Sequence, residues 1–198
     1  MTKPVALATT TWGTGPRRAL LLHGLTSAGA IWWRVADELV AMGFTVVAPD
    51  LRAHGNSPAG DDLTIGSYRD DVLLLGGGWD LLIGHSLGGA IAAVVSAVHP
   101  LFASRLNLED PALDSVETAR LLAESPEPTA NPTIAGIAAE HPDWHPRDVE
   151  IKVEALLQCG VEAPQRTMED ASPWDVWNEA GSVQVPTLLL AADPTQGS

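Results

Sequence analysis

The sequence predicts an α/β protein in which a mostly parallel sheet is covered by helices on both faces. Short apolar runs alternate with segments of helical periodicity through the first half of the chain, which is the pattern of strand–helix–strand units. Hydrophobic residues make up 45% of the 198 residues, which indicates a packed globular domain rather than a disordered chain. A chain of this length is long enough to bury one core.

The first half contains the elements of this sheet, and length and periodicity distinguish its strands from its helices. Each expected strand is a short apolar run. The expected helices end at Gly43, at the glycines 76–78 and at Pro100. In chain order the expected elements are a strand over 18–22, a helix over 30–42, a strand over 44–48, a helix over 63–75, a strand over 79–83, a helix over 87–99 and a strand over 106–108. The first helix is expected to place four apolar residues on one face: Ile31, Val35, Leu39 and Met42.

The pattern changes after Pro111. The segment that follows contains many prolines and no strand-like run until residues 185–192, which return to the apolar character of a buried strand. Helices are expected over 116–124, 132–140 and 147–158. The expected division of the chain is a core of residues 1–110 and 183–198 and a helical lid of residues 111–182, inserted between two strands of the sheet.

Composition and charge restrict the partners of this chain. The formal net charge is −14, so a nucleic acid backbone or an anionic membrane surface would be repelled. The apolar runs are too short to span a bilayer, and the start of the chain lacks the pattern of a signal peptide. Cys159 is the single cysteine, which excludes an internal disulfide and fits a reducing compartment. We expect a cytoplasmic protein with a small-molecule substrate and with no nucleic acid or membrane partner.

A five-residue motif between an expected strand and an expected helix indicates nucleophilic catalysis. Its sequence is Gly84-His85-Ser86-Leu87-Gly88, which matches the G-x-S-x-G nucleophile elbow. The glycines are needed because the strand and the helix crowd together at such a turn. The turn directs the serine oxygen toward the helix N-terminus, where an anionic intermediate is stabilised. The plainer alternative is a strand-to-helix turn with a capping serine.

Three motifs together carry a family resemblance. In chain order they are His23-Gly24-Leu25, Asp50-Leu51-Arg52-Ala53-His54-Gly55-Asn56-Ser57 and Gly84-His85-Ser86-Leu87-Gly88-Gly89. Their order and spacing resemble the α/β-hydrolase superfamily, whose lid position matches the segment after Pro111. The resemblance implies that Ser86 is the nucleophile and that the backbone N–H groups of Leu25 and Leu87 form an oxyanion hole. His23 and His54 are expected to hold loop structure rather than to carry protons.

In this family the serine is followed along the chain by an acid and then by a histidine. Asp193, directly after the strand expected over 185–192, is the expected acid, and Asp110 is the alternative. The resemblance places the histidine in a loop after one further strand, beyond Ser198, so the catalytic histidine is expected to be missing from this chain. We expect a longer gene product, or a second chain or self-association that completes an otherwise exposed apolar sheet edge.

Three residues are candidate substrate contacts. Trp32 and Trp33 closely follow the expected oxyanion loop, and His85 lies within the elbow; aromatic rings commonly line pockets. His141 and His145 in the lid are poor substitutes for the missing base, because loops do not position a base within a fraction of an ångström. No metal and no cofactor are expected.

The sequence therefore predicts hydrolysis of a carboxylic ester or a related small acyl substrate through a Ser86 acyl-enzyme, with little or no activity for this chain alone. A close alternative is hydrolysis of a carbon–carbon bond next to a ketone, which relatives perform with the same triad. Another alternative is a non-catalytic domain that binds a small molecule or a partner chain. Epoxide or haloalkane hydrolysis is disfavoured, because those relatives carry an aspartate where Ser86 stands.

Overall fold

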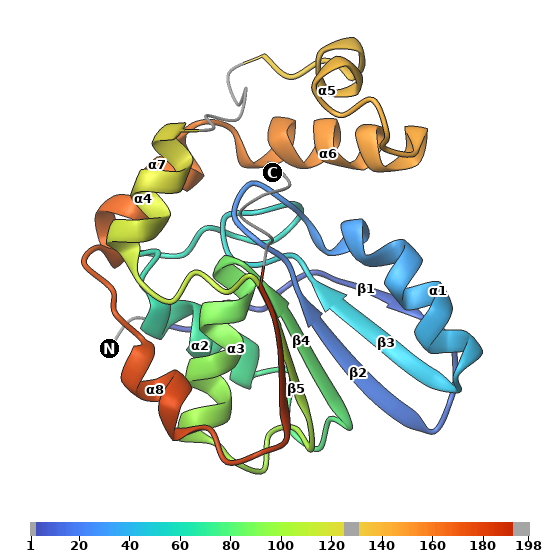
Figure 1. Ribbon diagram of the computed structural model, residues 1–198, viewed down its shortest axis with the longest axis vertical. Coiled ribbons are helices and arrows are strands. Elements are labelled where there is room, and N and C mark those ends of the chain that lie inside the picture. Colours follow the sequence, from blue (N-terminus) through green and yellow to red (C-terminus); the bar gives the residue numbers. More distant parts are fainter. Residues whose placement is uncertain (1–2, 125–130, 192–198) are drawn as a thin grey trace.

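Six strands form one sheet in the order β1-β3-β2-β4-β5-β6 in the computed structural model, which describes residues 3–124 and 131–191 (Figure 1). The edge strand β1 runs antiparallel to β3, and the other neighbouring pairs run parallel. This sheet confirms the predicted α/β class. The strands are β1 (Thr9–Trp12), β2 (Arg17–Leu22), β3 (Phe44–Pro49), β4 (Leu81–His85), β5 (Leu106–Glu109) and β6 (Thr187–Leu190).

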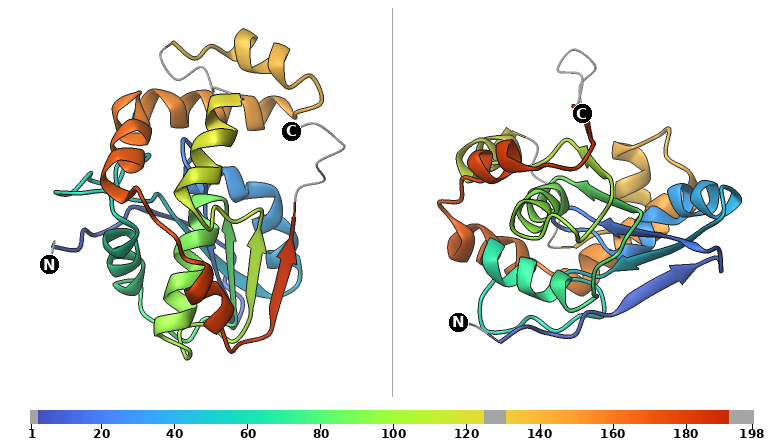
Figure 2. Two further views of the ribbon diagram at one scale, coloured as in Figure 1. Left: turned by 60° about the vertical axis from the view of Figure 1, so that its left-hand side comes forward. Right: turned by 90° about the horizontal axis from the view of Figure 1, so that it is seen from below.

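Helices cover both faces of the sheet, as predicted. Helix α1 lies on one face, whereas α2, α3 and α8 lie on the other, and α4 to α7 lie toward the carboxyl ends of the parallel strands (Figures 1 and 2). The helices are η1 (Gly29–Trp32, a 3₁₀ turn), α1 (Trp33–Ala41), α2 (Ile65–Leu73), α3 (Leu87–Val98), α4 (Ser115–Glu124), α5 (Ile134–Glu140), α6 (Pro146–Cys159), α7 (Glu162–Ala171) and α8 (Trp177–Ser182).

Strand β2 shows why the sequence of a central strand is a continuous apolar run. Side chains alternate between the two faces of a sheet, so Leu20 and Leu22 enter the cluster beneath α2 and α3. Ala19 and Leu21 enter the second cluster, beneath α1. Because both faces are covered, each of these positions is fully buried.

The face predicted for the first helix is wrong in part. Val35 is 37% exposed and Met42 is 59% exposed, whereas Ala36 is fully buried. The buried positions are Trp32, Ala36 and Leu39, which follow the i, i+4, i+7 spacing of a helix face. The small side chain of Ala36 sits where the helix meets the sheet, and the apolar pattern did not distinguish this face from the neighbouring one.

Strand β6 is paired on one side with β5, and within the described residues no strand pairs with its other side. Leu188, Leu189 and Leu190 are 49%, 58% and 49% exposed. These values confirm the exposed apolar strand expected from the sequence. Its completion by a second chain or by self-association stays a prediction, as does the division of the chain at residues 110 and 183. Helix α8, which that division assigns to the lid, packs against α3 beside the sheet.

No helix among the described residues has the length and apolar character needed to cross a bilayer. The cytoplasmic location stays a prediction.

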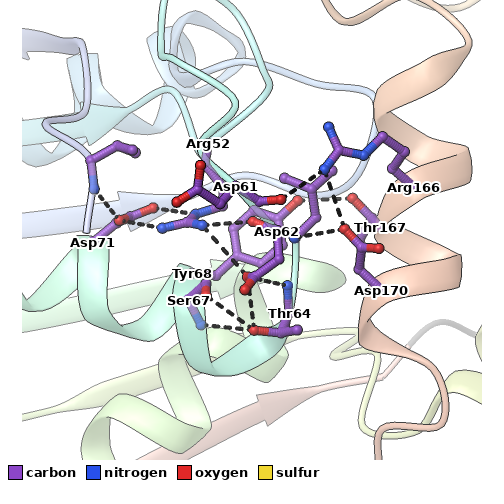
Figure 3. Close-up of polar contacts among 12 residues, drawn as sticks. Arg52, Asp61, Asp62, Thr64, Ser67, Tyr68, Asp71, Arg166, Thr167 and Asp170 are labelled. Atoms are coloured by element: carbon purple, nitrogen blue, oxygen red, sulfur yellow. Dashed lines mark hydrogen bonds and ion pairs between the residues drawn. The ribbon is translucent and has the colours of Figure 1, made fainter. Parts of the chain in front are cut away.

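A buried ion pair fixes the loop that follows β3. The guanidinium of Arg52 is fully buried, and its Nε and Nη2 donate to the two carboxylate oxygens of Asp71 on α2 at 2.6 and 2.7 Å (Figure 3). Arg52 Nη1 donates to the Asp62 carbonyl at 2.6 Å. Asp71 also accepts a hydrogen bond from the Val5 N–H at 2.7 Å. One buried pair therefore joins the loop, a helix and the N-terminal segment.

Helix α7 is attached to the same region by polar contacts. The Tyr68 hydroxyl lies 2.8 Å from Thr167 Oγ1, and both side chains are fully buried (Figure 3). The Leu63 N–H donates to Asp170 at 3.1 Å. Burial raises the pKa of the Tyr68 hydroxyl above its ordinary value of 10, so the group stays protonated and available to donate. These contacts fix α7 against α2 and the loop before it.

Breaking the ion pair between Arg52 and Asp71 is predicted to make the protein unfold more easily. The substitution Asp71→Asn leaves a buried guanidinium with only Asp62, 3.7 Å away, as a nearby carboxylate. We expect the free energy of unfolding to fall by about 3 kcal/mol, because a buried charge without its partner is costly. Urea denaturation measures this loss.

Asp70→Asn is the matched control on the same helix. Asp70 also lies 2.6 Å from an arginine, Arg69, but both side chains are about a third exposed. Its loss is expected to cost less than about 1 kcal/mol. Equal losses for the two variants would contradict this account of the buried pair.

Candidate active site

Ser86 lies in the turn between β4 and α3 with a strained backbone, at φ 50° and ψ −116°. Positive φ is uncommon for a residue with a side chain and persists only where surrounding contacts impose it. Those contacts are backbone hydrogen bonds: the Ser86 N–H donates to Glu109 O at 3.0 Å, and Ser86 O accepts from Ala90 and Ala112 at 3.1 and 3.0 Å. The Ser86 side chain makes no capping hydrogen bond, so the alternative of a capping serine is wrong.

The two glycines of the elbow are required by close backbone approach. A Cβ atom on Gly84 would lie 2.3 Å from Gly88 O, and one on Gly88 would lie 2.4 Å from Leu22 O at the end of β2. Neither distance is possible for a real side chain. The turn therefore lies against the end of β2. A Cβ atom on Gly24 would likewise lie 3.2 Å from the Ser86 Cβ, so the loop after β2 lies close to Ser86.

Leu25 and Leu87 carry the two N–H groups expected to form the oxyanion hole. Leu87 is the first residue of α3, where N–H groups lack intrahelical acceptors, and Leu25 follows the glycine that lies close to Ser86. Within the described part of the chain, neither N–H donates a hydrogen bond to another group. Both donors are therefore available to a ligand, although their role stays a prediction.

His23 fixes the orientation of the Leu25 N–H. Its Nδ1 lies 2.7 Å from Gly24 O, which only accepts, and its Nε2 lies 2.9 Å from the Leu51 N–H, which only donates. These partners assign a neutral ring with the proton on Nδ1. Because Gly24 O and the Leu25 N–H belong to one peptide group, the bond to Gly24 O holds that peptide plane.

His54 holds the next peptide in the same way. Its Nδ1 donates to Arg52 O at 2.8 Å, and its Nε2 accepts from the Thr26 N–H at 3.3 Å. The rings of His23 and His54 lie edge to face with centroids 5.2 Å apart. Burial lowers the pKa of both imidazoles, that of His23 well below its ordinary value of 6.5. These contacts confirm that the two histidines hold loop structure.

Asp110 is the candidate acid that the structure can place. It follows β5, and its neighbour Glu109 pairs in register with His85, so Asp110 lies at the same end of the sheet as Ser86. It is exposed, has φ 40°, and its N–H donates to Leu190 O at 2.7 Å. Asp193, the preferred acid, lies outside the described residues.

The Ser86 hydroxyl makes no hydrogen bond to any side chain described by the structure. The two histidines expected in the lid have other contacts. His141 stacks on Trp144 with ring centroids 3.9 Å apart, and His145 caps α6 by accepting from the Arg147 N–H at 3.1 Å. No group of three or more histidine, cysteine, aspartate or glutamate side chains in the described ranges is arranged to hold a metal ion.

The candidate substrate contacts lie in different surroundings. Trp32 is buried in the cluster beneath α1, and its Nε1 has no hydrogen-bond partner among the described residues. Trp33 donates from Nε1 to Asp148 on α6 at 2.7 Å, so it joins α1 to α6. His85 is exposed and lies beside Gly24. Contact of these three side chains with a substrate stays a prediction.

Sequence reasoning missed Lys152 on α6. Its ammonium group reaches the loop after β2, where it donates to the carbonyl and to the hydroxyl of Thr26, each at 3.2 Å. The signal was present, because Lys152 shares the i, i+3, i+4 spacing of Val149 and Leu156, both of which are buried. A lysine on an apolar helix face requires a buried partner.

The two imidazoles are predicted to make folding pH-dependent. A proton on Nε2 of either ring would face an N–H donor, and burial already lowers the pKa of both rings. Below pH of about 6.5 the unfolded chain therefore binds protons that the folded chain does not. The free energy of unfolding is fully retained above this pH and falls as the pH is lowered. For each pH unit below this value, each histidine raises the unfolding equilibrium constant by up to about tenfold.

Urea denaturation between pH 7.5 and 5 measures this dependence. The variant His54→Gln is expected to lose part of the slope, because one of the two titrating groups is gone. The control His99→Gln replaces an exposed histidine at the end of α3 and is expected to keep the slope of the unmodified protein. An unchanged slope in His54→Gln would refute this assignment.

A family model described as alpha/beta hydrolase fold matches residues 20–131, more than half of the chain. Lipase LipV of Mycobacterium tuberculosis is 38% identical over 104 residues, which are 50% of this chain and 39% of the lipase. The pimeloyl-acyl-carrier-protein methyl ester esterase of Chromobacterium violaceum is 31% identical over 162 residues, which are 80% of this chain and 53% of the esterase. The chain thus spans about half the length of these relatives, or less.

Solved structures give the same fold. The N-formylmaleamic acid deformylase Nfo of Pseudomonas putida matches with a TM-score of 0.74 and 25% identity, over 93% of this chain and 77% of that chain. An esterase from Thermogutta terrifontis matches with a TM-score of 0.70 and 25% identity, over 93% of this chain and 74% of the esterase. The matched family model and the parallel sheet with its elbow lead to one conclusion: the chain belongs to the alpha/beta hydrolase fold family.

Proposed function

We propose that the protein hydrolyses a carboxylic ester or a related small acyl substrate through an acyl-enzyme on Ser86. The observation that carries this proposal is the geometry of the elbow. Ser86 is held at positive φ, its hydroxyl is not used for capping, and two N–H groups beside it, those of Leu25 and Leu87, have no partner among the described residues. Strained backbone positions of this kind cluster at active sites.

In the proposed reaction, an imidazole base removes the hydroxyl proton of Ser86 as Oγ attacks the acyl carbon. The carbonyl oxygen becomes an oxyanion that accepts hydrogen bonds from the Leu25 and Leu87 N–H groups. Its collapse expels the alcohol, which takes the proton from the imidazolium and leaves the acyl group on Ser86. Water then attacks this ester with the help of the same base, which releases the acid and restores the hydroxyl.

The proposed base is a histidine oriented by Asp193 or Asp110. The family resemblance places it in a loop after a further strand, and no imidazole in residues 3–124 or 131–191 is hydrogen-bonded to Ser86. The names of the lipase and the esterase that resemble this chain support ester hydrolysis. Since the chain covers 39% of the first and 53% of the second, the activity is proposed for the protein encoded by the complete reading frame.

Labelling with a fluorophosphonate probe tests the proposal. The complete protein is expected to be labelled and to hydrolyse a short-chain aryl ester, and Ser86→Ala is expected to abolish labelling and lower the hydrolysis rate at least about a thousandfold, because the nucleophile is lost. Ser96→Ala is the matched control: Ser96 lies on α3, the helix that Ser86 precedes, and its buried hydroxyl has no partner among the described residues. A complete protein that is neither labelled nor active would favour a binding domain without catalysis.

A further inference from the structure

Lys152 is a buried cation whose contacts are directed at the proposed site. It is 8% exposed on the face of α6 that also carries Val149 and Leu156. Removing an ammonium group from water is costly unless polar partners replace the lost hydration. Part of that replacement comes from Thr26, whose carbonyl oxygen and hydroxyl oxygen each accept from Lys152 Nζ at 3.2 Å. A lid residue thus contacts the loop after β2 directly.

The hydroxyl of Thr26 connects Lys152 to Leu25 through two hydrogen bonds. Thr26 Oγ1 donates its proton to Leu25 O at 2.6 Å while it accepts from Lys152. An ammonium group only donates, so it orients the hydroxyl with its proton toward Leu25 O. The peptide between Leu25 and Thr26 is then held at both ends, by this bond and by the bond from the Thr26 N–H to His54.

Leu25 therefore lies between two fixed peptides, the first of which carries its N–H group. His23 holds the preceding one through Gly24 O, and Thr26 with His54 holds the following one. Thr26 itself has φ 60°, which a β-branched residue adopts only where contacts impose it. His23 and His54 belong to the core loops, whereas Lys152 contributes its contacts from the lid.

Helix α6 has further attachments that do not involve Lys152. Asp148, in its first turn, accepts from Trp33 Nε1 at 2.7 Å and pairs with Arg34 at 2.9 Å, both on α1. The loss of Lys152 therefore leaves these anchors intact. A change in activity on its removal would report on the loop rather than on detachment of the lid.

We propose that Lys152 is a positioning residue that joins the lid helix α6 to the loop carrying the Leu25 N–H, so that the seating of the lid, together with His23, sets the orientation of this oxyanion-hole donor. The inference rests on the proposed ester hydrolysis. A donor that acts on the oxyanion stabilises the transition state more than bound substrate, so its misorientation lowers kcat with little change in KM. A merely structural lysine would not produce this split.

The experiment compares kinetics of the complete protein on a short-chain aryl ester. Lys152→Met is expected to lower kcat about tenfold, less than the hundredfold or more for complete loss of such a donor, with KM unchanged within about twofold. Thr26→Val, which keeps the shape but removes the hydroxyl, is expected to lower kcat similarly, and Thr26→Ser to keep it. The double variant Lys152→Met with Thr26→Val is expected to be no slower than the slower single variant, because both break one chain of bonds.

Glu154→Gln is the control, since Glu154 is an exposed charge on the same helix and its loss is expected to leave kcat and KM unchanged. If Lys152→Met does not fold, Thr26→Val against Thr26→Ser decides the question. A wild-type kcat in Lys152→Met or Thr26→Val, or an effect confined to KM, would overturn the inference while Ser86 labelling keeps the proposed function. An unmodified protein without labelling or hydrolysis would overturn the proposed function, and this inference with it.

Discussion

The backbone of the turn between β4 and α3 packs directly against the backbone at the end of β2, with no room for a side chain between the two segments. A Cβ atom on Gly88 would lie 2.4 Å from Leu22 O, so only glycine allows this contact. The contact fixes where α3 begins, and therefore where the N–H groups of its first turn point. Ser86, in the same turn, is held at a positive φ by its backbone hydrogen bonds. The strain is maintained because residues 87–96 of α3 are buried against the sheet and cannot shift to relieve it.

The loop after β2 is positioned by hydrogen bonds in addition to the apolar packing of Leu25. His23 and His54 each donate from Nδ1 to a carbonyl and accept at Nε2 from an N–H, and this pattern requires neutral rings. Burial keeps them neutral by lowering their pKa. Both ring nitrogens of each histidine are occupied, so neither ring can act as a base for Ser86. A neutral ring with two fixed partners has one orientation, so both rings hold the loop rigidly.

The sequence predicted those features whose cause is local. Central strands buried on both faces must be apolar throughout, so β2 to β5 could be read from short runs, and the elbow from its glycines. Strand β1 was missed because its residues Thr9–Trp12 are mostly exposed and are held by backbone pairing with β3. Helix α7 was missed because polar contacts, such as that of Tyr68 with Thr167, hold it in place. The role of Lys152 depends on Thr26, 126 positions away, which no local pattern reveals.

Helices α5 and α6, which belong to the expected lid, have a small apolar cluster of their own, made by Ile137, Val149 and Leu156. Helix α6 also contacts the rest of the protein through polar groups. This difference has a consequence for specificity. Apolar burial is non-directional and tolerates sliding, whereas the bonds of Asp148 to Trp33 and of Lys152 to Thr26 hold only in one register. If Lys152 positions the loop as proposed, a substrate that displaces α6 also releases Thr26. The fit of a substrate beneath α6 then determines how well the oxyanion is stabilised. A poorly fitting ester is therefore bound without being hydrolysed efficiently.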